Sequence, residues 1–172
     1  MANTFELIAS STVGAGGAAN ITFSSIASSW TDLCLKVSVR SNNSDGNVYD
    51  QINLFFNNVN DFTTKVIQGS GSTVASYQPS GSGVQLPIIT GNSATANTFG
   101  NFEIYIPNYA GSTNKSFSID SVNENNATTA YSQLDAGLWS NTSAINAIKM
   151  QPSVGTLFLQ YSTAYLYGVK NA

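Results

Sequence analysis

Apolar and polar residues alternate along most of this chain, and helical periodicity is nearly absent. Such alternation is typical of a β-strand with one buried face, because successive side chains point to opposite sides of a sheet. The clearest example is the segment from Leu33 to Val39, in which every second residue is apolar. Strands are expected over residues 5–7, 20–24, 33–40, 51–56, 65–68, 99–106, 115–122, 131–139, 145–150 and 156–169.

Clusters of Gly, Asn, Asp and Ser separate these runs, as in residues 42–47 and 57–61, and such clusters form turns. About ten short strands spaced by polar turns predict an all-β fold, an antiparallel β-sandwich with little or no helix. The uneven strand lengths favour a sandwich over a closed barrel. Residues 1–172 are expected to form a single domain, because sandwiches of this size fold as one unit. In the last strand, Leu157, Leu159, Tyr161 and Thr163 are expected to share one face.

Glycine and serine dominate two stretches, 69–72 and 79–83, which bracket Val74 to Tyr77. Gly/Ser-rich segments behave as flexible loops. We therefore expect residues 69–83 to form a loop excursion from the sandwich, with Tyr77 and Pro79 near its tip.

Aromatic residues in loops are the main candidates for a binding role, since they can anchor a protein interface or stack on a sugar. Tyr77, Tyr109, Tyr131 and Trp139 are such residues. Trp139 follows Leu138 at a strand end and is expected in the core. The candidate interface residues are Tyr77, Pro79 and Tyr109.

The chain has no histidine, one cysteine and only 9% charged residues. The missing histidine excludes Ser-His-Asp and Cys-His catalysis and histidine-based zinc sites. No glycine is followed by lysine, so a Walker-type phosphate loop is excluded as well. Glu6, Glu103 and Glu124, or the aspartates, could supply a glycosidase-type carboxylate pair, but nothing in the sequence places any two of them together. Glu103 lies on the polar phase of its strand, where a solvated residue is expected. We expect that the protein is not an enzyme and that it has no catalytic residues and no cofactor.

An oxygen-rich calcium site would not need histidine, and three aspartates lie in or beside neighbouring loops. These are Asp45, Asp50 and Asp61. An EF-hand alignment of this region puts Ser41 and Ile52 at the first and last ligand positions, so that match fails. Asp in turns ordinarily binds backbone amides, and no metal is expected.

The net charge is −3, and the six basic residues are scattered singly, which argues against a nucleic-acid partner. No apolar run is long enough to span a membrane. Cys34 is expected to be a buried core residue, because no second cysteine can pair with it and no histidine can activate it. Residues 1–4 lack the basic region of a secretory signal, so we expect synthesis in a cytoplasm.

Several segments, in order along nearly the whole chain, are similar to the motifs of one protein family. They are residues 21–26 with 30–33, residues 51–57, residues 99–109, residues 138–148 and residues 161–169. These segments resemble virion proteins of tailed phages, and Arg40 closes a strand where that family also carries arginine. The departures are Tyr161, where glycine is common, and the Gly/Ser-rich segment 69–83.

The resemblance implies a jelly-roll-like sandwich on the outside of the phage particle, without shared catalytic residues. The expected function is that of a capsid decoration (cement) protein, made in the host cytoplasm and located on the outer capsid surface. Its expected partners are the major capsid protein and its own copies, as a homotrimer over the joints between capsomers. The alternative is a receptor-binding module of a tail fibre or spike that contacts host glycans, with Tyr77 as its first candidate residue.

Overall fold

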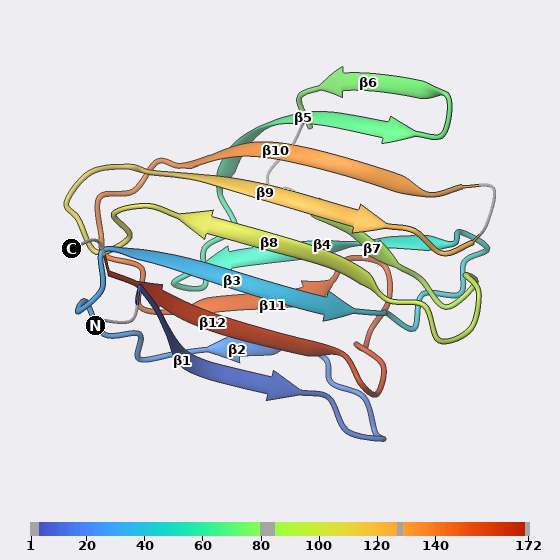
Figure 1. The fold of residues 1–172 in the computed structure, drawn as a ribbon, viewed down its shortest axis with the longest axis horizontal. Coiled ribbons are helices and arrows are strands. Elements are labelled where there is room, and N and C mark those ends of the chain that lie inside the picture. Colours follow the sequence, from blue (N-terminus) through green and yellow to red (C-terminus); the bar gives the residue numbers. More distant parts are fainter. Residues whose placement is uncertain (1–3, 80–84, 127–128, 171–172) are drawn as a thin grey trace.

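Two antiparallel sheets of unequal size pack face to face in the computed structural model, which describes residues 4–79, 85–126 and 129–170 (Figure 1). The larger sheet contains, in spatial order, β1 (Phe5–Thr12), β12 (Thr163–Val169), β3 (Asp32–Val39), β8 (Gly100–Ile106), β9 (Lys115–Asn123), β10 (Tyr131–Trp139), β5 (Phe62–Ser70) and β6 (Thr73–Tyr77). The smaller sheet contains β2 (Ile21–Phe23), β11 (Ile148–Pro152), β4 (Tyr49–Phe56) and β7 (Gln85–Thr90). No helix occurs in the described residues. The predicted all-β antiparallel sandwich is confirmed, while the jelly-roll connectivity stays a prediction.

The alternation of the sequence corresponds to alternating burial in the strands. β9 is the most regular case, since it buries every second residue from Lys115 to Asn123 and exposes those between. The buried side chains of the two sheets form one hydrophobic cluster. Alternation of this kind fixes the face to which each side chain points, and so the sandwich has one apolar interior.

Aromatic rings join the two sheets across the interior. Phe56 of β4 packs edge-to-face against three rings of the larger sheet. The partners are Phe62, Phe117 and Trp139, with ring centroids 5.0, 5.3 and 5.8 Å from that of Phe56. This is the preferred arrangement of aromatic pairs. Trp139 is buried, so its predicted core position is confirmed.

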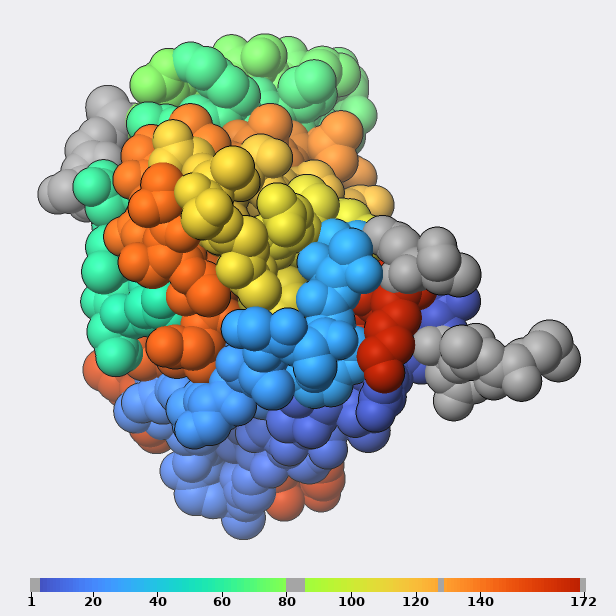
Figure 2. Space-filling model, turned by 90° about the vertical axis from the view of Figure 1, so that its left-hand side faces the viewer, coloured from blue at the N-terminus to red at the C-terminus, as the bar shows by residue number. Residues whose placement is uncertain are grey.

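The prediction of a loop over residues 69–83 is wrong for its first part. Residues up to Ser70 continue β5, Gly71 turns the chain at a φ of 66°, and β6 returns antiparallel to β5. The hairpin forms one extremity of the molecule (green in Figure 2). Pairing with β5 supplies the backbone hydrogen bonds that overcome the weak strand preference of Gly and Ser. Residues 80–84 lie outside the described residues.

Two further differences concern strands. The sequence pattern misses β7, which contains Pro87; β7 is an edge strand, where proline is tolerated. The last strand begins at Thr163 rather than at residue 156, so the predicted shared face of residues 157–163 is wrong. The physical reason is that the backbone of this segment bonds to distant loops: Phe158 exchanges hydrogen bonds with Ala18, and the Leu159 amide donates to the Arg40 carbonyl.

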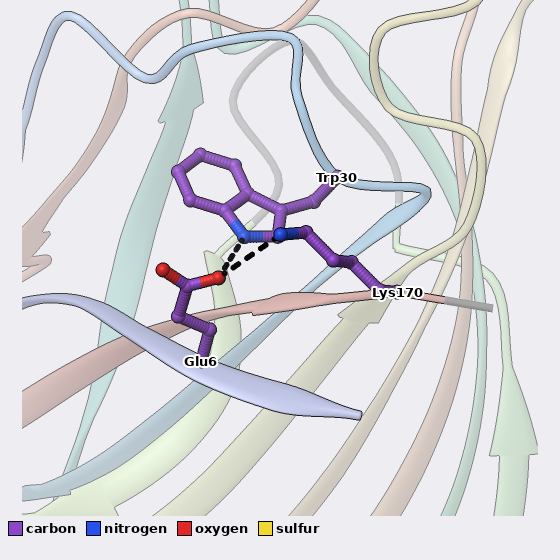
Figure 3. A network of polar contacts seen from close by, with 3 residues as sticks. All are labelled: Glu6, Trp30 and Lys170. Carbon is purple, nitrogen blue, oxygen red and sulfur yellow. Dashed lines mark hydrogen bonds and ion pairs between the residues drawn. The ribbon is translucent and has the colours of Figure 1, made fainter. Parts of the chain in front are cut away.

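β1 begins and β12 ends at the same end of the sandwich (Figure 1), where Glu6, Trp30 and Lys170 connect β1 to the rest of the structure (Figure 3). The Trp30 indole donates to Glu6 Oε2 at 3.2 Å, and Lys170 Nζ lies 3.3 Å from the same oxygen. The Trp30 hydrogen bond is the largest single cause that lowers the pKa of Glu6, and the contact with Lys170 lowers this pKa as well. The Trp30 ring covers Gly168, where a Cβ would lie 2.2 Å from the ring. Glycine is therefore required opposite Glu6 in the β1–β12 pair.

Gly137 provides a test of the aromatic packing between the sheets. It lies opposite Phe117 in the β9–β10 pair, and a Cβ there would lie 2.2 Å from the Phe117 ring. The ring is held by Phe56 and Phe62, so it has no room to move. We expect Gly137→Ala to lower the free energy of unfolding by about 1–3 kcal/mol, the usual cost of overpacking.

The matched control is Gly69→Ala in the neighbouring strand, where the nearest atom would be 3.9 Å away. This change should cost less than about 0.5 kcal/mol, as ordinary surface substitutions do. Urea unfolding of the two variants measures the difference. Equal losses of stability would contradict the close packing of the Phe117 ring against Gly137.

Candidate functional site

The structure does not bring the three predicted interface residues together. Tyr77 lies at the end of β6, is 39% exposed, and donates its hydroxyl proton to Gln68 Oε1 at 2.9 Å. Partial burial raises the pKa of that hydroxyl. Pro79 is half-buried just beyond β6. Tyr109 is fully buried, and its hydroxyl donates to the Ala27 carbonyl, so its assignment to an interface is corrected. It is a core residue because its ring packs within the hydrophobic cluster.

An apolar cluster that the sequence analysis missed lies on the outer face of the larger sheet. It consists of Ile67, Val74, Val122 and Leu134, with exposures between 44% and 79%, and is called the edge patch here. Ile67 and Leu134 are directly opposed on β5 and β10. Val74 and Val122 flank them on β6 and β9, each within reach of a diagonal cross-strand contact. The sequence did contain a signal for this cluster: in β5, β6 and β9, one apolar residue stands among the alternate positions that are otherwise polar or glycine.

The edge patch adjoins a free sheet edge. β6 pairs only with β5 among the described residues, and all five of its residues are exposed. The unpaired amides and carbonyls of such a strand can accept a strand from another chain. The edge patch contains no charged side chain, although Lys65 and Asp120 lie at its border, opposite Ala136 and Leu134. Exposed apolar side chains beside unpaired backbone groups are features that protein–protein contacts use.

In the middle of the same outer face, the polar side chains pair with one another and the thiol of Cys34 is buried. Lys36 and Glu103 form an ion pair with 2.7 Å between Nζ and Oε2, so Glu103 is solvated as its strand phase predicts. Cys34 is buried between its register neighbours Tyr105 and Tyr167. Burial, and secondarily Glu103, raise the pKa of the thiol to about 11. The thiol is therefore protonated at neutral pH and is not a nucleophile.

Two of the three aspartates considered for calcium, Asp50 and Asp45, bind backbone amides. Asp50 accepts hydrogen bonds from the amides of Gln51, Val154 and Gly155 at 2.7, 3.1 and 2.9 Å. Asp45 accepts from the Asn47 amide at 2.9 Å. Within the described ranges, no group of three or more Cys, Asp or Glu side chains could hold a metal ion.

Asp135 is the carboxyl group most strongly altered by its surroundings. It is 1% exposed, accepts a 2.7 Å hydrogen bond from Gln133 Nε2, and has no partner for Oδ2. The buried Thr64 Oγ1 and Gln133 Oε1 also lack partners. Burial raises the pKa of Asp135 to about 6, although the hydrogen bond from Gln133 lowers this pKa to a smaller extent. A carboxyl so enclosed cannot touch a substrate, and its effect is on stability.

Three loops meet at the end of the sandwich where β1 ends and β12 begins (Figure 1). Residues of these loops line a pocket. Its volume is about 390 Å³, and the loops are residues 15–17, 92–99 and 157–161. Arg40 forms its base, and burial lowers the pKa of the guanidinium. Nη1 donates to the carbonyls of Thr95 and Thr98 at 2.7 and 3.0 Å, and Nη2 donates to those of Asn92 and Ala94 at 3.0 and 2.9 Å. This pocket is called the end pocket.

No protein-family model matches the chain, and neither curated proteins nor solved structures provide a match. The described residues form no helix that is long and apolar enough to cross a membrane. Function is therefore inferred from the motifs of the sequence and from the edge patch and the end pocket.

Asp135 makes stability depend on pH. Its folded-state pKa of about 6 lies above the ordinary 3.8, so the protonated form is favoured by folding. The contribution of Asp135 to stability is then fully present below about pH 4, falls as the pH rises to about 6, and is lost above it. A shift of this size corresponds to about 3 kcal/mol.

We expect Asp135→Asn to remove this fall and to stabilise the fold at pH 7 by up to about 3 kcal/mol, because the amide cannot ionise. Asp120→Asn, at an exposed position of β9, is the control and should keep the fall. Denaturant unfolding between pH 4 and pH 8 measures both variants. If the stability of Asp135→Asn fell with pH in parallel with that of the unchanged protein, Asp135 would not be the group that causes the fall.

Proposed function

We propose that this chain is a non-enzymatic surface protein of a tailed-phage particle that decorates the outer capsid. The observation that carries the proposal is the edge patch beside the free strand β6. Exposed apolar residues on four adjacent strands, next to unpaired backbone groups, favour a permanent contact with another protein. The phage-like segments of the sequence support the same class of protein.

Decoration needs one surface for copies of the chain and another for the shell. The larger sheet offers two separate edges, β6 and β1. Phe5 and Leu7 are exposed on the outer face of β1, so this edge too carries apolar residues. We assign one edge to contacts within a homotrimer and the other to the major capsid protein. Such interfaces depend on packing and main-chain hydrogen bonds, which fits a chain with few charges.

The alternative is a tail-fibre or spike module that contacts host glycans, and the end pocket favours it because loops there line an open pocket of ligand size. Copy number separates the two functions. Decoration requires hundreds of copies per particle, whereas a tail module is present in a handful. Band intensity relative to the major capsid protein in purified particles measures the number.

The decoration function predicts that particles carrying the protein withstand heating better than particles without it. Ile67→Asp combined with Val74→Asp places two charges in the edge patch and should abolish this protection, because buried unpaired charges oppose association. Val154→Asp, at an exposed valine after β11, is the control and should protect normally. Capsid melting with and without each purified variant gives the readout. Equal shell stability with and without the unchanged protein would overturn the proposal.

A further inference from the structure

Tyr161 holds a backbone conformation that tyrosine rarely adopts. Its φ is 71°, in the left-handed region, where a bulky side chain strains the backbone. Its side chain is also 70% exposed, so it contributes little to the core. Neither the local backbone nor packing explains a tyrosine here. Strain of this kind is concentrated at functional sites, where the surrounding structure holds it.

The surroundings of Tyr161 are rigid. Its amide donates to the Val13 carbonyl at 3.0 Å, and the Val13 amide donates to the Ser162 carbonyl at 2.8 Å. Ser162 is fully buried, and its hydroxyl accepts a hydrogen bond from the Arg40 amide at 3.2 Å. The backbone that carries the ring is thus held in place, and the ring itself faces solvent. A preformed platform reduces the entropy lost when a ligand binds.

Tyr161 lines the end pocket, whose volume of about 390 Å³ is in the range of small-ligand sites. The half-buried Phe99 is a second aromatic lining residue. Asn92, Asn97 and Gln160 supply three side-chain amides, and among the described residues none of these amides is used in a hydrogen bond. Amides both donate and accept, which matches the hydroxyl groups of a sugar.

The remaining lining residues narrow the ligand class. Arg40 is the only charged residue there, and its Nη1 and Nη2 donors are already bound to loop carbonyls. A ligand that requires a strong charge partner is therefore disfavoured. A sugar ring fits, because its apolar C–H face can lie on an aromatic ring while its hydroxyl groups bond to amides.

We propose that the end pocket binds a terminal saccharide unit, with Tyr161 as the stacking platform and Asn92, Asn97 and Gln160 as the hydroxyl partners. This site goes beyond the proposed decoration function, since it lies at the loop end of the sandwich and not at the edge patch. A decoration protein with such a site would also attach the particle to a glycan surface.

The experiment uses the purified full chain on an array of mono- to tetrasaccharides containing hexoses, N-acetylhexosamines and uronic acids, followed by calorimetric titration of any saccharide bound. We expect Tyr161→Gly to weaken binding at least tenfold, while raising the unfolding temperature by about 2–4 °C through relief of backbone strain. A merely structural role would not give opposite changes in binding and stability.

Two controls test the ring itself. Tyr161→Phe keeps the stacking face and should retain binding within about threefold, and Tyr165→Ala removes an exposed tyrosine of β12 outside the pocket and should leave binding unchanged. Absence of binding to every saccharide, or full binding by Tyr161→Gly, would overturn the proposal. Capsid protection by the Tyr161 variants should remain normal. Failure of the saccharide site is thereby distinguished from failure of the decoration function.

Discussion

The guanidinium of Arg40 is the contact on which the loop end of the molecule depends. Arg40 follows β3 of the larger sheet, and its side chain donates to four carbonyls of residues 92–98, the connection from β7 to β8. Its own carbonyl accepts the amide of Leu159, so the loop before β12 is held as well. A buried cation is here stabilised by carbonyl dipoles rather than by a carboxylate. Loss of the side chain would remove these four hydrogen bonds, and the cost would be greatest at the Ala94 carbonyl, whose bond to Arg40 is buried.

The unequal width of the two sheets explains where the surfaces for assembly lie. Strands are about 4.8 Å apart, so four strands cannot cover the width of eight. The edge strand β6 is exposed along its whole length, whereas the other edge strand, β1, packs Ile8 and Ala9 against the core and exposes Phe5 and Leu7. Apolar residues at these edges remain available to a partner. The middle of the same sheet offers no comparable apolar surface, because Lys36 pairs with Glu103 there and Cys34 is buried.

Particular residues show how far sequence reasoning reaches here. Trp139 could be placed in the core from its strand alone, because period-two alternation is a local property. Tyr109 was misplaced, since a tyrosine in a turn gives no sign of whether the core closes over it. The Gly/Ser flanks of β6 predict a loop because they have weak strand preference, and pairing with β5 overrides that preference. Tyr161 was assigned to a strand, whereas distant hydrogen bonds hold it at positive φ.

The order of residues along the chain already determines the all-β class, the inward phase of strands such as β9, and the absence of histidine chemistry. These follow from composition and from contacts between near neighbours. The edge patch, the end pocket and the raised pKa of Asp135 were decided only by the tertiary structure. Each requires segments far apart in sequence to become neighbours, as Ile67 and Leu134 do across β5 and β10. Alternation tells which face a side chain takes, but only strand pairing determines which side chains lie beside it.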